Sequence, residues 1–349
     1  MALTIPLPRH LFRSDPQVVC TSDGFEVTAR TYPTGIQSLT IRSSRGHVEV
    51  LPFMGQIIWD AEFDGVSLRM DNMFDQPRPA ASIEDTYGCF AFHAGLLAAG
   101  CPAPEDTHPL HGEFACMALD TAELVADGDQ LTVRSYGEYV KGFGHHYLAA
   151  PSVTLTADAS TFDIAMTVTN LSAYADMPLQ YMCHMNYAFS PGARFTQSIP
   201  DDAFRLRDTV PAHVTPTPAW EQVNEELRGG RRDPQSLQGA EDYDPEIVFF
   251  ADDLPHYGED LIFRMDAPNG GQFVTAFASS EFPTATRWIL HNPDQKVAAF
   301  VLPGTSRPEG FLAADRAGTL IRLRAGETRT FRVRTGLESS PADCLSKES

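Results

Sequence analysis

Two short stretches of the chain carry histidines in settings suited to acid–base chemistry. His111 lies in the segment 108–113, which follows a Gly- and Pro-rich run and precedes a β-patterned segment. His184 and Asn186 alternate along the otherwise apolar and aromatic run 179–187. Residues two apart on a strand face the same side of a sheet, so we expect His184 and Asn186 to point together. Two histidines on neighbouring strands would suit one small polar ligand, because an unperturbed imidazole titrates at about pH 6.5.

Composition restricts the classes of partner. The chain has 349 residues, 43% of them hydrophobic and 21% charged, and a formal net charge of −20. Such an acidic protein, with no basic cluster, is a poor candidate for binding nucleic acid or an anionic membrane surface. No run reaches the length of a membrane helix, and residues 1–9 lack the features of a signal peptide. The six cysteines are scattered without a paired framework, which favours a reducing, cytoplasmic setting.

The elements that must position these residues read mostly as short strands. Apolar and acidic residues alternate over 59–63, and Asp64-Gly65 then marks a hairpin turn. Similar patterns predict hairpins at 124–133 and 153–168. Later strands are predicted at 246–250, 261–265, 272–278, 286–291, 296–302, 319–324 and 328–334. No helix longer than a few turns is convincing, so the chain is predicted to be a single all-β domain, 1–349, with an antiparallel sandwich.

Three segments interrupt the strand pattern. Residues 1–16 read as a Pro-containing N-terminal arm with little regular structure. The segment 70–107 is rich in Pro and Gly and reads as connecting structure, and 211–245 mixes Pro, Gly and charges of both signs, as a surface excursion does. Long irregular segments of compact domains are usually functional or disordered. We therefore expect 70–107 and 211–245 to shape whatever the histidines bind.

The ordered set of motifs resembles the galactose mutarotase-like (aldose 1-epimerase) superfamily, in a divergent bacterial branch. The resemblance rests on the hairpin 51–65, Leu110-His111-Gly112, Asn170 at the end of a strand, His184-Met185-Asn186, and the turn 325–327 before the last strand. It spans nearly the whole chain. It implies a large antiparallel β-super-sandwich that holds a sugar in a cleft on one sheet.

The resemblance also implies a mechanism. One group takes the proton of the anomeric hydroxyl while another protonates the ring oxygen, and the opened chain rotates about C1–C2 and recloses on the other face. In this scheme His184 is the acid, and His111 binds or assists at the ring oxygen. The reaction needs an acid and a base with suitable pKa values, both within hydrogen-bond reach of the sugar.

The sequence departs from the family at the base. Relatives place a catalytic Glu directly before a Pro on a late strand, and here that position reads as Leu302, which cannot accept a proton. Glu309, a few residues later, and Glu113, beside His111, are the alternative carboxylates. The family's substrate-binding Arg has no clear counterpart, and the nearest upstream arginine is Arg78. The predicted sugar-binding residues are His93, Asn186, Glu113 and Arg78.

Three functions remain open from the sequence. The first is a mutarotase or epimerase acting on a free aldose or sugar acid. The second, motivated by Leu302, is a non-catalytic sugar-binding protein on the same scaffold. The third is a metal-dependent isomerase or lyase using His93, His108, His111 and His184. The chain lacks Cys-x-x-Cys and His-Glu-x-x-His motifs, so we expect no metal or other cofactor and a small carbohydrate as the partner.

Overall fold

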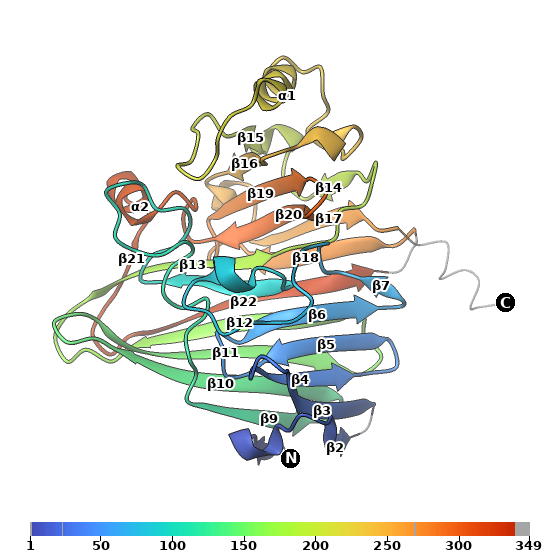
Figure 1. The fold of residues 1–349 in the computed structure, drawn as a ribbon. Coiled ribbons are helices and arrows are strands. Elements are labelled where there is room, and N and C mark those ends of the chain that lie inside the picture. Colours follow the sequence, from blue (N-terminus) through green and yellow to red (C-terminus); the bar gives the residue numbers. More distant parts are fainter. Residues whose placement is uncertain (1, 23, 269, 339–349) are drawn as a thin grey trace.

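Two antiparallel sheets build the protein (Figure 1). The computed structural model describes residues 2–22, 24–268 and 270–338. In spatial order, the first sheet contains β1 (Leu3–Pro6), β9 (Thr121–Asp127), β10 (Gln130–Val140), β11 (His146–Thr156), β12 (Thr161–Asn170), β22 (Thr328–Glu338), β18 (Gln272–Ala278), β17 (Asp260–Asp266) and β14 (Phe195–Gln197). The all-β super-sandwich expected from the sequence is therefore confirmed.

The second sheet carries the predicted histidine strand at its middle. Its order is β15 (Arg205–Leu206), β16 (Ile247–Ala251), β19 (Thr284–His291), β20 (Lys296–Gly304), β13 (Met177–Met185), β8 (Ala91–Leu96), β6 (Ile57–Phe63), β5 (Gly46–Leu51), β4 (Gln37–Arg42), β3 (Phe25–Thr31) and β2 (Gln17–Ser22). The short strands β21 (Ile321–Leu323) and β7 (Val66–Ser67) pair with β13 and β6.

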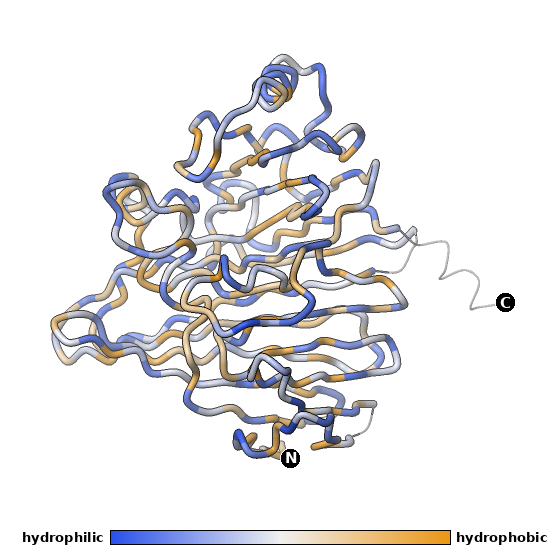
Figure 2. Tube along the Cα trace, viewed as in Figure 1, coloured by the Kyte–Doolittle hydropathy of each residue, from blue (hydrophilic) through white to orange (hydrophobic). Residues whose placement is uncertain are grey.

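Apolar side chains fill the space between the two sheets. Along β11 and β12, buried and half-buried residues alternate, as expected when one face of a strand is packed and the other is not. Figure 2 shows this alternation as successive orange and blue stretches of the strands. Phe162 of β12 lies 5.9 Å from Phe63 of β6, ring centre to ring centre. Burial of each such ring contributes about 1.5–3 kcal/mol, so these contacts hold the two sheets together.

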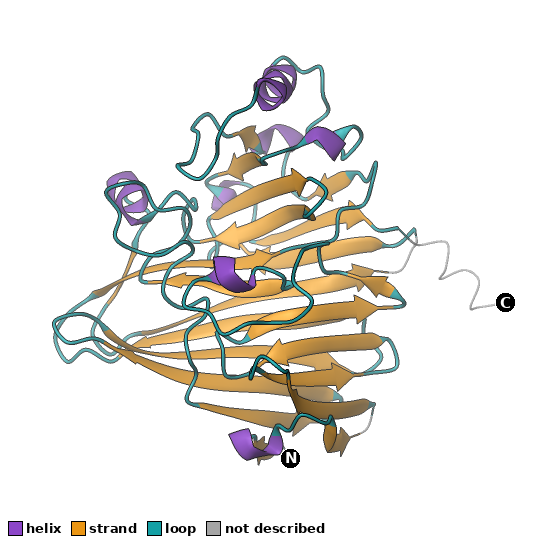
Figure 3. Ribbon diagram, viewed as in Figure 1, coloured by secondary structure: helices purple, strands orange, loops and turns teal. Residues whose placement is uncertain are grey.

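The middle strands of the second sheet are buried on both faces. Every residue of β13 and of β8 is buried. Tyr181 of β13 packs against Phe331 of β22, so it faces the space between the sheets. Met182 and His184 face the other way, where loops and the short helix η2 (Ile83–Thr86) cover the sheet (Figure 3). The outer face of β13 is thus enclosed, which allows it to line a cavity.

Two segments predicted to be irregular contain strands, and those predictions were wrong there. The 1–16 arm includes β1, which pairs with β9 from Leu3 opposite Ala126 to Pro6 opposite Glu123. An edge strand tolerates proline because one row of its backbone groups needs no partner strand. The segment 70–107 includes β8, which pairs with β13. Its sequence shows no alternation because both of its faces are buried.

The 211–245 segment contains a helix and borders the site. Helix α1 (Pro218–Arg228) begins after Thr217, whose Oγ1 accepts a hydrogen bond from the Trp220 backbone N–H at 3.1 Å. The Trp220 indole N–H donates to the backbone oxygen of Glu246 at 2.6 Å, which ties the helix to the start of β16. In the portions of the chain that the structure describes, no helix combines the length and apolarity needed to span a bilayer.

Candidate functional site

A cavity of about 360 Å³ opens on the outer face of the second sheet. Strand residues that line it include Met182 and His184 of β13, Thr286 and Trp288 of β19, Val248 of β16 and Leu302 of β20. Loop residues complete it, among them residues 72–74, Tyr87, Cys101, His111, Arg207 and His213. The segments 70–107 and 211–245 therefore shape the cavity, as the sequence led us to expect.

Strand register explains why these side chains meet. Directly opposed residues of antiparallel strands project from the same face. Thr286 lies opposite Leu302, and Trp288 lies opposite Val248. On the other side, His184 lies opposite Phe92 of β8. The four strands from β16 to β13 thus present one continuous face to the cavity.

His184 lies within a cluster of aromatic rings. Its imidazole stacks on Phe92 at 4.6 Å and lies 4.9 Å from the ring of His111, centre to centre. Its Nε2 is 3.3 Å from the hydroxyl oxygen of Tyr87. Burial, and secondarily the neighbouring His111, lower the pKa of His184 well below its ordinary value, although Asn186 acts in the opposite direction. His184 is therefore a neutral imidazole at pH 7.

Backbone geometry fixes His111 beside it. The His111 residue has a φ of +60°, in the left-handed region, and its N–H donates to Gly100 O at 2.9 Å. Gly112 follows with a φ of +84°, and a Cβ there would lie 2.0 Å from the oxygen of Ala98. Only glycine fits that position, which gives the Leu-His-Gly motif a structural reason. Burial lowers the pKa of His111 to about 3, so this imidazole is also neutral at pH 7.

The buried polar atoms of this histidine cluster are incompletely paired. In the described part of the chain, His111 Nδ1, His184 Nδ1 and Asn186 Oδ1 are buried and make no hydrogen bond of normal geometry, although Asn186 lies close enough to His184 to raise its pKa. Native proteins usually satisfy such atoms, and exceptions often mark functional places. The Asn186 amide nitrogen donates to Cys89 O at 3.0 Å, so Asn186 supports the site from within the wall. It does not line the cavity.

A second group of cavity residues is charged. Glu246 accepts a hydrogen bond from the Trp288 indole N–H at 2.7 Å. Its Oε1 lies 3.5 Å from His213 Nε2 and 3.8 Å from an Arg207 guanidinium nitrogen. Interactions with the Cys101 side chain and with Glu246 raise the pKa of His213 to about 10. The cavity thus holds a carboxylate beside an imidazole that is protonated at neutral pH.

The sequence did not reveal this charged group. Glu246 precedes β16 and follows Pro245, while Arg207 and His213 lie in irregular stretches of the chain. None of them belongs to a motif, and Tyr87 likewise follows the short helix η2 without a local signal. Only the pairing of β16 with β19 brings Glu246 to Trp288 and into the cavity.

Two residues that the sequence predicted to bind the sugar, His93 and Glu113, point away from the cavity. His93 follows Phe92 on β8, so it points to the opposite face and bonds the Tyr181 hydroxyl through Nδ1 at 2.8 Å. Burial lowers the pKa of His93 to about 3. Glu113 accepts hydrogen bonds from the Leu96 N–H at 3.0 Å and the Tyr147 hydroxyl at 2.8 Å. Glu113 holds the end of β8 in place and does not line the cavity.

Two others lie outside the cavity lining. Glu309 accepts from the Thr209 hydroxyl at 3.0 Å, lies 3.7 Å from a nitrogen of Arg207, and lines a separate hollow together with Arg307. Arg78 is exposed, and its backbone N–H donates to Thr86 Oγ1 at 3.0 Å. Of the residues predicted from sequence, His111, His184 and Leu302 share the cavity.

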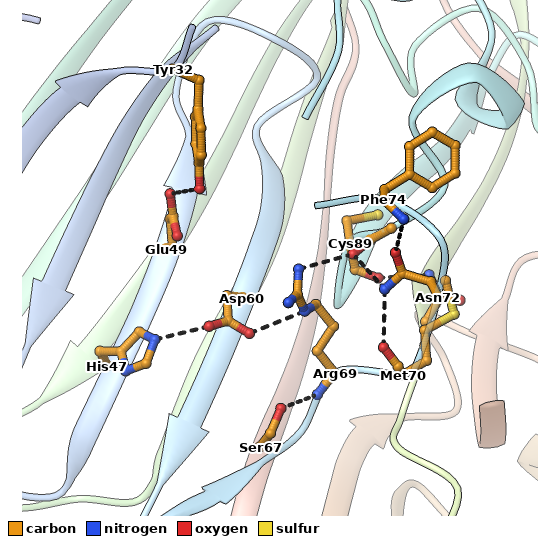
Figure 4. A network of polar contacts seen from close by, with 12 residues as sticks. Tyr32, His47, Glu49, Asp60, Ser67, Arg69, Met70, Asn72, Phe74 and Cys89 are labelled. Carbon is orange, nitrogen blue, oxygen red and sulfur yellow. Dashed lines mark hydrogen bonds and ion pairs between the residues drawn. The ribbon is translucent and has the colours of Figure 1, made fainter. Parts of the chain in front are cut away.

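A polar network on the outer face fixes one rim of the cavity (Figure 4). Asp60 of β6 lies 3.0 Å from His47 Nε2 and 3.3 Å from Arg69 Nε. Burial raises the pKa of Asp60, but the His47 hydrogen bond and the Arg69 charge outweigh it and lower the pKa below its usual value. Asn72 Nδ2 donates to Gly88 O at 3.3 Å, and its Oδ1 accepts from the Phe74 N–H at 2.8 Å. These bonds hold Asn72 and Phe74 in the cavity lining.

The histidines considered as metal ligands are spread over different places. His93 faces the interior, and His108 Nε2 accepts a hydrogen bond from the Phe311 N–H at 3.2 Å. Among residues 2–22, 24–268 and 270–338, no group of three or more His, Cys, Asp or Glu side chains is arranged to hold a metal ion.

Solved structures share this architecture. A candidate aldose 1-epimerase from Klebsiella pneumoniae matches with a TM-score of 0.77 at 17% identity, over 100% of this chain and 94% of its own. A galactose mutarotase-like protein from Clostridium acetobutylicum matches with a TM-score of 0.62 at 15% identity, over 91% and 100%. A candidate aldose 1-epimerase from Escherichia coli K12 matches with 0.54 at 16%, over 84% and 96%. The fold is the galactose mutarotase-like super-sandwich.

A sequence-family model also matches most of the chain. Residues 33–337 match the model of a family described as a domain of unknown function, DUF4432. The chain belongs to this family. None of the curated proteins matches the sequence.

Proposed function

We propose that the cavity binds a small carbohydrate and interconverts its anomers by acid–base ring opening. The observation that carries the proposal is the Glu246–His213 pair, 3.5 Å apart, in the cavity that His111 and His184 also line. A carboxylate, a protonated imidazole and two neutral imidazoles provide the proton acceptor, proton donor and hydrogen-bonding groups that the reaction requires. The fold that the chain shares with the mutarotase-like structures supports the same function.

The chemistry places the acid and the base close together. The anomeric hydroxyl and the ring oxygen are bonded to the same carbon, so one adjacent pair of groups can serve both. Glu246 takes the hydroxyl proton, a carbonyl forms at C1, the bond from C1 to the ring oxygen breaks, and that oxygen receives a proton. Rotation about C1–C2 and reversal of these steps return the other anomer, with both protein groups in their starting states.

Two residues are candidates for the proton donor. The family resemblance implies His184, but burial keeps its imidazole neutral, so a bound sugar would have to raise its pKa before it could donate. His213 is already protonated at pH 7 because its pKa is raised to about 10. If His213 is the donor, the rate falls as pH rises through its raised pKa, and His213→Asn lowers the rate at neutral pH as well. If His184 is the donor, the rate rises as pH falls below neutrality.

Exchange NMR on the α and β anomers of a panel of free aldoses tests the proposal. We expect the protein to accelerate interconversion of at least one sugar above the buffer rate, and Glu246→Gln to abolish the acceleration. The same rate with and without protein, for every sugar of the panel, would refute mutarotation.

A second function, non-catalytic sugar binding, is favoured by Leu302, which stands where the resemblance to the mutarotase superfamily implies the catalytic Glu and is 1% exposed. Saturable binding in calorimetry without acceleration of anomer exchange would identify it.

The cytoplasm is the setting that we propose. Cys20, Cys89, Cys101, Cys116 and Cys183 are free thiols, and Cys344 lies outside the described residues. Free thiols persist in reducing compartments, which supports this location. Mass-spectrometric counting of alkylated cysteines in protein from gently lysed cells would check it.

A further inference from the structure

We propose that the ligand is an uncharged deoxy sugar, whose deoxygenated carbon lies against Leu302. The inference rests on the proposed carbohydrate binding and narrows it to a substrate class. It is carried by an apolar wall of the cavity, by the absence of an excess of positive charge around it, and by the cost of leaving a sugar hydroxyl unpaired.

The apolar wall consists of Val248, Trp288, Leu290 and Leu302, from three adjacent strands. Leu302 is 1% exposed, Val248 7% and Leu290 8%, so the surrounding chain packs closely around each side chain. Thr286, opposite Leu302, supplies a hydroxyl beside this wall. The face that strands β16, β19 and β20 turn to the ligand is therefore largely aliphatic and aromatic.

Hydrogen-bonding groups occur elsewhere in the cavity. His111, His184 and Tyr87 form one group, in which His184 contacts both of the others. Arg207, His213 and Glu246 form the second group. A ligand that satisfies both groups has several hydroxyls but keeps one apolar side for the wall. Every aldose has an apolar side of C–H groups that can pack on Trp288, and a deoxy sugar extends this side by the carbon that lacks a hydroxyl, which we place against Leu302.

The charges of the cavity argue against an anionic sugar. Two cationic residues, Arg207 and His213, line it together with three carboxylates, Glu84, Glu246 and Asp294. A fourth carboxylate, that of Glu309, lies 3.7 Å from Arg207 although it does not line the cavity. The cations are therefore already balanced, and the protein as a whole carries a net charge of −20. A sugar carboxylate would meet repulsion on approach, so the neutral sugar is favoured over the sugar acid.

The cost of a misplaced hydroxyl sets the expected selectivity. A hydroxyl buried without a partner costs about 1–3 kcal/mol, which corresponds to roughly five- to 150-fold in affinity. A sugar with a hydroxyl at the carbon that meets Leu302 loses this much binding free energy. The deoxy sugar buries a C–H group there and does not.

Matched sugar pairs that differ by one hydroxyl test the inference. We suggest D-galactose with 6-deoxy-D-galactose, D-glucose with its 2-deoxy and 6-deoxy forms, and L-mannose with 6-deoxy-L-mannose, titrated while tryptophan fluorescence is followed, since Trp288 lines the cavity. We expect the deoxy member of at least one pair to bind roughly tenfold more tightly. Leu302→Ser should reduce or reverse that preference, and the apolar control Leu302→Met should retain it.

The outcomes separate this inference from the proposed function. If the hydroxylated member binds equally or more tightly in every pair, the inference is overturned, while faster anomer exchange of those sugars would still support the proposed function. A uronic acid that binds more tightly than its neutral parent would also overturn it. Tight binding of a deoxy sugar without faster exchange would support the inference and remove catalysis. If no sugar binds, both fail. Should Leu302→Ser not fold, the pair comparison on the unaltered chain decides.

Discussion

Glu246→Gln is the substitution that tests the proposed chemistry most directly. Glutamine has nearly the same shape, and its amide oxygen can still accept the hydrogen bond that Glu246 receives from the Trp288 indole at 2.7 Å. The cavity therefore keeps its form. What is lost is the ability to take a proton, because an amide is not a base in the neutral range.

The substitution should change both the rate and the stability. Loss of a positioned general base costs roughly 10²–10⁴ in rate, equivalent to about 3–5 kcal/mol of transition-state stabilisation. The lost ion pairs are long, at 3.5 Å to His213 and 3.8 Å to Arg207, and the His213 side chain is 48% exposed. The exposed His213 pair contributes about 0–1 kcal/mol to stability. The Arg207 pair joins side chains that are only 11% and 13% exposed, so its loss costs more, although Glu309 at 3.7 Å remains beside Arg207. The rate is therefore compared on samples that urea unfolding shows to be folded.

The assay is anomer exchange by NMR at saturating sugar, with urea unfolding measured on the same samples. Glu309→Gln is the matched control, because Glu309 also lies 3.7 Å from Arg207 yet does not line the cavity. We expect the control to keep the rate within about threefold of the unaltered protein. A Glu246→Gln variant that keeps its rate, or a Glu309→Gln variant that loses as much, would refute the assignment of the base.

Three further predictions concern His184, Tyr147 and His93. His184→Asn should lower the exchange rate and leave the fold intact, as circular dichroism would show; an unfolded variant would instead make His184 a structural residue. Tyr147→Phe should destabilise the protein by about 1–3 kcal/mol in urea without changing the rate, because Glu113 loses the hydroxyl donor at 2.8 Å; a variant as stable as the parent would contradict this. His93 has a folded-state pKa of about 3 against an ordinary value of 6.5, so between these values the unfolded chain binds the extra proton and stability falls as pH falls. Urea unfolding at pH 5 should show a loss of roughly 2 kcal/mol from this residue relative to pH 7, and His93→Gln should lose less; equal losses would refute the assignment.

Local patterns in the sequence were sufficient for most of the fold. Strands with one packed face, such as β6, β10 and β12, alternate in hydrophobicity, and Asp64-Gly65 closes a hairpin as expected. His111 and His184 line one cavity, but the prediction that they lie on neighbouring strands is wrong for His111, which lies in a turn with a φ of +60°. For the strands and the hairpin, the information lies within a few neighbouring residues.

The parts of the fold and of the site that the sequence did not predict depend on pairings between distant segments. The pairing of β8 with β13, about ninety residues away along the chain, decides on which face of the sheet His93 lies. The sequence of β8 shows no alternation, because both faces of the strand are covered. Glu246 enters the cavity only because β16 pairs with β19. Similarly, Glu113 is turned away by backbone N–H groups at the end of β8 that no local pattern reveals.

Leu302 and Glu246 are connected through the strand between them. Leu302 on β20 lies opposite Thr286 of β19, and the Trp288 indole of the same strand binds the Glu246 carboxylate that precedes β16. The carboxylate that the mutarotase resemblance implies on β20 thus has a possible counterpart two strands away, held by Trp288 in the same cavity. If Glu246 is the base, leucine at 302 removes no chemistry, and it frees that part of the wall to bind an apolar group. Catalysis and sugar preference are then carried by different side chains, so Glu246→Gln should change the rate without changing the deoxy-sugar preference, and Leu302→Ser should change the preference first.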